Sequence, residues 1–357
     1  MKSNFDFLNR YWPALAQIGA TAETYVYSDP NACIYKLGMF AERLVQEILV
    51  FEHIAEPAVD NTHANRIRIL KRAGLLPHEI DNTLYVLRKT RNSAVHIGTD
   101  SVDEAKTLLS LTYNLAVWFM ETYGDWGYIA PEFVMPSETT HEDLESVIAE
   151  QERKIEELTK QLAVVKTAAS GKTQKERAKR SESVSAMMNW NEAQTRCLID
   201  EQLRLSGWEA DTQNLRYSKG TRPVKGRNIA ISEWPTNSAF YKNGYADYAF
   251  FVGEKLVALM DAKKMSEDVA STIDVQVKDY AAHIKPEDIP HTVGNWNGYQ
   301  VPFLFASNGR AYLEQLRTKS GIWFLDVREQ ENQPYPIRNW FSPSDLMEKL
   351  GQNTAAA

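Results

Sequence analysis

The chain has 357 residues, of which 43% are hydrophobic and 24% are charged, and its formal net charge at pH 7 is -7. This length predicts about two or three domains, and the composition excludes collagen, wholesale disorder and a disulfide-stapled miniprotein. The charge excludes a uniformly basic DNA-coating protein, although a nucleic-acid enzyme needs only a local basic groove. No apolar run reaches the roughly 20 residues of a membrane span, and the two cysteines fit a reducing cytoplasm. We therefore expect a cytoplasmic, multidomain protein without membrane contact.

The first 135 residues have the hydrophobic spacing of helices and few strand signals. Helical patterns cover residues 32–54, 67–73, 84–95 and 102–123. Gly74 and Pro77 interrupt the chain between two of these helices. We expect residues 1–135 to form a helical bundle.

A different pattern occupies residues 136–185. Between residues 142 and 165, apolar residues recur in alternating steps of four and three, with Gln151 at the polar position. This a/d seam predicts either a short coiled coil or a helix that lies on a neighbouring domain. Residues 168–183 are rich in Ala, Ser, Lys and Arg, and we expect a solvated linker or the frayed end of the heptad helix there.

Residues 186–345 mix helical and strand patterns. The helical patterns cover 192–205, 266–284 and 311–316, and the strand patterns cover 245–252, 256–260, 301–306 and 322–325. This order indicates an α/β domain with a central mixed sheet. The whole chain is therefore expected to be multidomain, with a helical bundle, a coiled-coil-like linker and an α/β domain, followed by a tail over residues 346–357.

Two apolar strands of this domain meet at a tight turn at Gly253. Asp247 begins the first strand and Asp261 ends the second, so an antiparallel hairpin brings the two acids together. Adjacent carboxylates repel unless a hard cation lies between them, and Mg²⁺ commonly binds one or two carboxylates. Lys263 shares the face of Asp261, where its ammonium can hold a metal-bound water for attack on phosphorus. The alternative is a surface hairpin with scattered charges.

Three further residues extend this candidate site. Gln276 and Tyr280 are four residues apart on the next predicted helix, so one face offers an amide and a phenol to a phosphate or a base. A surface pair without function is the alternative. Glu192 opens the first helix of the domain, where it either reaches the metal and its waters or stabilises the helix N-terminus.

These residues form a recognisable set of motifs. The set comprises Thr195-Arg196, Ile199-Asp200, Gly207-Trp208, Asp247, Asp261-Ala262-Lys263, Gln276 with Tyr280, and Pro302 to Arg310. The acids and the lysine have the PD-(D/E)xK form, and the next pair has the Q-x-x-x-Y form. Residues 192–325 thereby resemble the nuclease domain of the restriction (R) subunit of type I restriction-modification enzymes. Ala246 stands where the named motif has proline, and Asp261 stands where glutamate is commoner.

The resemblance implies a restriction-endonuclease-like domain that cuts double-stranded DNA with Mg²⁺. Asp247 and Asp261 would bind Mg²⁺, Lys263 would serve the attacking water, and Gln276 and Tyr280 would support cleavage or DNA contact. It also implies methyltransferase and specificity subunits as partners, and an ATP-driven motor after the nuclease. The sequence has no motor motif, so we expect an amino-terminal fragment, with a natural stand-alone protein as the alternative.

A basic run inside this domain favours a nucleic-acid partner. It consists of Arg216, Lys219, Arg222, Lys225 and Arg227. Each phosphate that such a cation neutralises adds salt-dependent affinity, so we interpret the run as DNA contacts rather than as a mobile solvated loop.

A second motif lies in the helical region. Arg91, Asn92 and His96 are similar to the R-x4-6-H motif of HEPN helical domains, and the resemblance covers residues 30–120. In the RNases among those domains, the histidine assists proton transfer and the arginine holds phosphate. The alternatives are a helix cap or a hydrogen bond between helices. Two other functions for the chain thus stay open, a HEPN-type RNase and a non-catalytic module that binds a partner or a nucleic acid.

Overall fold

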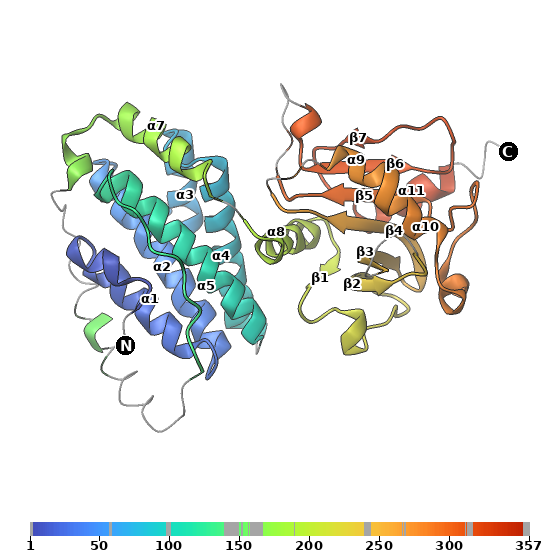
Figure 1. The fold of residues 1–357 in the computed structure, drawn as a ribbon, viewed down its shortest axis with the longest axis horizontal. Helices are drawn as coiled ribbons and strands as arrows, with labels where there is room; N and C mark the ends of the chain where they lie inside the picture. The colour runs from blue at the N-terminus through green and yellow to red at the C-terminus, as the bar shows by residue number, and fades with distance from the viewer. Residues whose placement is uncertain are drawn as a thin grey trace. The chain divides into compact units, whose positions relative to one another are not determined.

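The computed structural model describes residues 3–56, 59–97, 101–138, 150, 153–155, 157, 167–188, 190–238, 244–265, 267, 269–310, 312 and 317–352. The chain divides into two units, here called the helical unit (Met1–Asn189) and the sheet unit (Trp190–Ala357) (Figure 1). In the described part of the chain, no helix is long and apolar enough to cross a membrane.

The helical unit is the expected bundle. Its elements are η1 (Asp6–Arg10), α1 (Pro13–Tyr25), α2 (Pro30–Phe51), α3 (His63–Arg72), α4 (His78–Ile97), α5 (Val102–Phe119), η2 (Met120–Gly124), η4 (Ala168–Gly171) and α7 (Gln174–Ser185). Helix α2 contacts α1, α3, α4 and α5, and buried apolar residues occur along its whole length. The Asp29 side chain accepts a hydrogen bond from the Ala32 amide, and Pro30 occupies the first turn, so α2 begins with two strong start signals. The four predicted helical stretches correspond to α2, α3, α4 and α5 with η2, whereas α1 was not predicted.

Residues 168–183 differ from the solvated linker that we expected. Helix α7 begins with a reciprocal cap, because the Thr173 hydroxyl accepts from the Glu176 amide and Glu176 accepts from the Thr173 amide. Arg177 is 8% exposed and donates from Nε to Oε1 of Glu52 at 2.7 Å, inside the helical unit. Three of the four buried residues of α7 are polar, with Val184 the exception, so an apolar pattern could not reveal the helix. The heptad stretch at 142–165 lies almost entirely outside the described residues.

The sheet unit contains the mixed sheet that the sequence predicts. Its strands are β1 (Glu209–Ala210), β2 (Asn228–Pro235), β3 (Tyr245–Val252), β4 (Lys255–Ala262), β5 (Phe303–Ser307), β6 (Ile322–Asp326) and β7 (Tyr335–Pro336). They lie side by side in chain order, with parallel pairing between β1 and β2 and between β4 and β5 and antiparallel pairing elsewhere. The short edge strands β1 and β7, and the longer β2, were not predicted.

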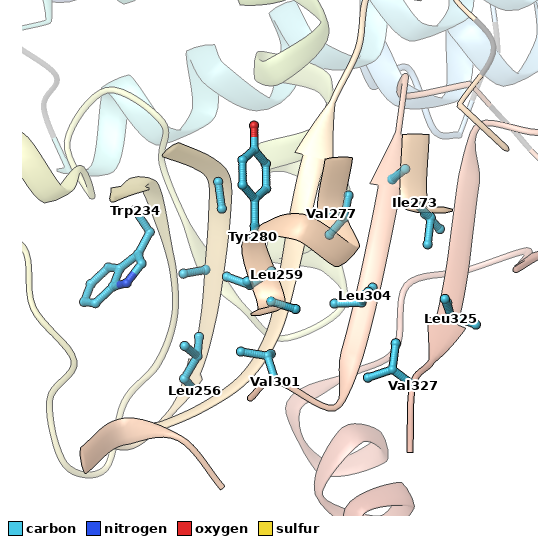
Figure 2. Close-up of a cluster of buried hydrophobic side chains, with 14 of the residues drawn as sticks. Trp234, Leu256, Leu259, Ile273, Val277, Tyr280, Val301, Leu304, Leu325 and Val327 are labelled. Carbon is cyan, nitrogen blue, oxygen red and sulfur yellow. The ribbon is translucent and has the colours of Figure 1, made fainter. Parts of the chain in front are cut away.

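Helices cover both faces of this sheet. They are α8 (Glu192–Leu205), η5 (Tyr217–Lys219), α9 (Ala270–Thr272), η6 (Ile273–Val277), α10 (Lys278–Ala282), η7 (Pro286–His291), η8 (Arg317–Lys319) and α11 (Pro343–Gln352). On one face, Leu259 and Leu304 pack in a buried cluster with Ile273, Val277 and Tyr280 from η6 and α10 (Figure 2). The other face packs against α8 and α11.

The end of the described chain also differs from our expectation. Leu346 of α11 is fully buried in the core of the sheet unit, so residues 346–352 are part of the fold and not a tail. The helix predicted at 192–205 is α8, and the one predicted at 266–284 is the α9–η6–α10 segment. The helix predicted at 311–316 lies outside the described residues except for residue 312.

Candidate active site

Asp247 and Asp261 lie opposite one another at the open end of the β3–β4 hairpin. Tyr248 pairs with Met260 in the antiparallel ladder, so the next residues outward are the two aspartates. The Ala262 amide donates to Oδ2 of Asp247 at 2.6 Å, which ties the two strand ends together. The structure therefore brings the two predicted metal ligands side by side.

A β-bulge in β4 produces this alignment. The strands leave the Gly253-Glu254 turn in a register that, continued regularly, pairs Asp247 with Met260 and turns Asp261 to the opposite face. The register shifts in the middle of the hairpin, where Val257 is the extra residue. This one-residue shift returns Asp261 to the face of Asp247.

Lys263, Gln276 and Tyr280 join Asp261 in a continuous polar row. Lys263 Nζ lies 2.6 Å from Oδ2 of Asp261 and donates to Oε1 of Gln276 at 2.8 Å. Gln276 Nε2 donates to Oδ1 of Asp261 at 2.6 Å and to the Tyr280 hydroxyl at 2.7 Å. Gln276 thus contacts the strand acid directly, and Tyr280 joins it through Gln276, so the two do not stand apart as a surface pair.

Strand alternation explains why the helix meets these side chains. Asp261 and Lys263 share a face with Leu259, and that face packs against η6 and α10. The Tyr280 ring belongs to the apolar cluster, whereas its hydroxyl points away from the cluster (Figure 2). Tyr280 therefore contributes to the core and to the polar row with different parts of one side chain.

The acids are placed where ionisation is costly. Asp261 is 2% exposed, and its burial, together with the neighbouring Asp247, raises its pKa to about 7 against the opposing effect of Lys263. Burial also raises the pKa of Asp247, although Arg196 and the Ala262 amide oppose that shift. For Lys263, burial alone lowers the pKa, but the adjacent Asp261 carboxylate outweighs it and raises the pKa overall. A cation between the acids would relieve this electrostatic strain.

The donor atoms suit Mg²⁺. Oδ2 of Asp261 is buried and, apart from the nearby Lys263 ammonium, accepts no well-directed hydrogen bond. Within the described residues, no group of three or more His, Cys, Asp and Glu side chains could surround one ion. Two carboxylates completed by waters are an ordinary magnesium set, so Asp247 and Asp261 fit this metal in type and number.

Arg196 of α8 is a site residue that lies in one of the sequence motifs, although the motif predicts no role for it. Its Nη2 donates to Oδ1 of Asp247 and, at 2.7 Å, to Oε1 of Glu192. Its Nη1 lies 3.7 Å from Oε1 of Glu233. The available signal was the matched Thr195-Arg196 pair, but spacing alone does not show that this helix reaches β3.

Two glutamates flank this arginine. Glu192 is the first residue of α8, its side chain is 51% exposed, and it joins Asp247 only through Arg196. Glu233 lies beside Asp247 in the β2–β3 ladder and has a left-handed φ of 53°, which is uncommon for a side chain of this size. Such outliers are concentrated at functional sites.

The predicted basic run does not gather at one place. Arg216 binds Glu233, next to Asp247. Arg227 pairs with Glu209 beside the Gly253 turn, which lies roughly 17 Å of strand away from Asp247 by the rise per residue. Exposed side chains in between belong to Lys219, Arg222 and Lys225. Only the start of the run therefore adjoins the acids.

The second predicted motif lies in the helical unit. Arg91 Nη1 contacts Oε2 of Glu42 at 2.6 Å, and its guanidinium stacks on the Tyr35 ring. Asn92 is exposed, and the side chain of His96 lies outside the described residues. The arginine thus has partners in helix packing, and its pairing with His96 stays a prediction.

Comparison with known proteins agrees with the site. A family model described as the type I restriction enzyme EcoKI endonuclease subunit second domain matches residues 209–350. Over 428 aligned positions, which include 98% of this chain, the chain is 29% identical to the type I restriction enzyme EcoKI endonuclease subunit of Escherichia coli strain K12. The chain is therefore similar to type I restriction enzyme endonuclease subunits. It spans 36% of the length of this relative. No solved structure matches the chain.

Proposed function

We propose that this chain carries the Mg²⁺-dependent nuclease of a type I restriction enzyme, which cuts double-stranded DNA. The observation that carries the proposal is the polar row at the open end of the hairpin. Asp247 and Asp261 adjoin there, and Lys263 and Gln276 contact the second acid directly. This row supplies the two acids and the amine that hydrolysis of a phosphodiester requires.

Each residue has a distinct task in this proposal. Asp247 and Asp261 would hold Mg²⁺, which supplies a Lewis acid and lowers the pKa of a bound water. Lys263 remains protonated at neutral pH because the neighbouring carboxylate raises its pKa, so its ammonium can hold the attacking water by hydrogen bonding. Gln276 positions the side chains of Lys263 and Asp261 through a hydrogen bond to each, and Tyr280 links Gln276 to the core.

Similarity to this relative supports proposals for the remaining parts of the enzyme. The relative is an endonuclease subunit, which implies other subunits. We propose methyltransferase and specificity subunits as partners, and ATP as the fuel of a motor outside this chain. Arg216 next to the acids is the first candidate for a DNA phosphate contact, because the rest of the basic run lies further off.

Asp261→Ala in the full-length enzyme tests the proposal. Restriction of unmodified DNA should fall more than about 100-fold, since even outer residues of metal sites cost about 10- to 100-fold. Asp274→Ala is a matched control, because this exposed carboxylate on η6 pairs only with Lys278 in the described structure and should restrict normally. Normal restriction by the Asp261 variant would refute the proposal. Loss of restriction by both variants would indicate that the substitutions disrupt assembly of the enzyme, and it would favour a non-catalytic module.

A further inference from the structure

Arg196 donates a hydrogen bond to Asp247, whose carboxylate the metal would need. One oxygen of Asp247, Oδ1, accepts from Arg196 Nη2, and the other, Oδ2, accepts from the Ala262 amide. The Arg196 side chain is only 12% exposed, so this contact is shielded from water. We infer that Arg196 is a positioning residue that competes with the divalent cation for Asp247 and thereby sets the affinity of the site; the inference rests on the proposed function.

Charge makes the competition unavoidable. Arginine keeps its proton at every ordinary pH, so its guanidinium stays positive beside an arriving divalent cation. Two positive charges that contact the same buried carboxylate repel each other strongly. The cation can therefore bind Asp247 fully only if the guanidinium withdraws from Oδ1.

The surrounding glutamates give Arg196 a place to go. Nη2 already donates to Glu192, and Nη1 lies 3.7 Å from Glu233. These two carboxylates are 51% and 35% exposed, so they can adjust their positions at low cost. Arg196 can thus leave Asp247 and retain two acidic partners without entering bulk water. Glu192 has a role in this arrangement without being a metal ligand.

Titration with Mn²⁺ alone, followed by calorimetry, tests the competition in the intact chain without DNA. Arg196→Met keeps most of the length of the buried side chain and removes its charge. This variant should bind Mn²⁺ at least about tenfold more tightly than the wild type, because a positive charge that repels the cation is removed. Arg196→Lys keeps the charge and should stay closer to the wild type. Arg227→Met is the matched control, since it makes the same change at the other end of the hairpin and should leave the affinity unchanged.

The titration is best done above neutral pH. Removing Arg196 raises the pKa of Asp247, so a proton would replace the lost guanidinium at lower pH and mask the gain in metal affinity. Unchanged or weaker Mn²⁺ binding by Arg196→Met, with a wild type that binds, would overturn the inference and leave the proposed function standing. A wild type that binds no Mn²⁺ at all would instead remove the basis of both.

A second measurement does not depend on the folding of the methionine variant. In the wild-type chain labelled with ¹⁵N-arginine, the side-chain signal of Arg196 should shift when Mg²⁺ is added, because the guanidinium leaves Asp247. The Arg196→Lys variant identifies the signal by its disappearance. A signal that stays fixed while Mg²⁺ binds would overturn the inference.

Discussion

Substitution of Asp261 by asparagine should stabilise the metal-free sheet unit while it destroys the metal site. Asp261 is 2% exposed, and its pKa in the fold is about 7, compared with 3.8 for an unperturbed aspartate. Because the folded pKa is raised, the stability contributed by proton binding is present below pH 4 and is lost as pH rises to about 7. At pH 8 the full shift corresponds to about 4 kcal/mol, since each pKa unit is worth about 1.4 kcal/mol.

The asparagine variant avoids this cost because its side chain is always neutral. We expect a gain of about 2–4 kcal/mol at pH 8, the lower value allowing for a Lys263 ammonium that has lost its charged partner. The gain should shrink steadily toward zero between pH 7 and pH 3.

Urea unfolding in the presence of EDTA measures this effect at several pH values. If the two units unfold in separate transitions, the substitution should shift only the transition of the sheet unit. Destabilisation at pH 8, or a change that is the same at pH 4 and pH 8, would refute the reasoning, because the burial of an ionised Asp261 would then cost nothing. Added Mg²⁺ should stabilise the wild type and leave the variant unaffected.

Three other substitutions test neighbouring contacts. Gln276→Leu should slow DNA cleavage by the full-length enzyme about tenfold or more, because Lys263 and Asp261 lose their shared amide; cleavage at the wild-type rate would contradict this. Tyr280→Phe keeps the ring in the core and should change the free energy of unfolding by less than about 1 kcal/mol, yet it should reduce DNA cleavage. A large loss of stability would show that the hydroxyl has a structural role. Arg177→Met leaves a buried carboxylate unpaired in the helical unit and should cost about 3–5 kcal/mol in urea unfolding; a cost below about 1 kcal/mol would mean that α7 does not depend on this ion pair.

The strands that carry the acids could be predicted because their signals are local. Apolar runs bounded by Gly253 indicate a hairpin, and the Q-x-x-x-Y spacing places Gln276 and Tyr280 on one helical face. The alignment of the acids could not be predicted by counting, because a regular two-residue turn places Asp247 and Asp261 on opposite faces. The bulge at Val257 corrects this, and no local residue preference marks it.

Contacts between distant segments account for what the sequence analysis missed. Arg196 reaches Asp247 only because α8 and β3 meet in the folded sheet unit. Helix α7 resembles a linker in composition, since Arg177 and Ser181 face the bundle through polar contacts and not through an apolar stripe. A polar composition does not by itself identify a solvated segment, because polar side chains can be buried when they have hydrogen-bonding partners.

In the proposed site, one divalent cation joins the two aspartates. Crystals of the chain soaked in Mn²⁺ test it most directly, because the anomalous signal locates the ion without reference to activity. We expect a peak between Asp247 and Asp261, at about 2.1 Å from a carboxylate oxygen of each, with Lys263 beside it. A saturating soak that leaves this position empty, with the ion bound elsewhere in the sheet unit or not at all, would contradict the proposed metal site.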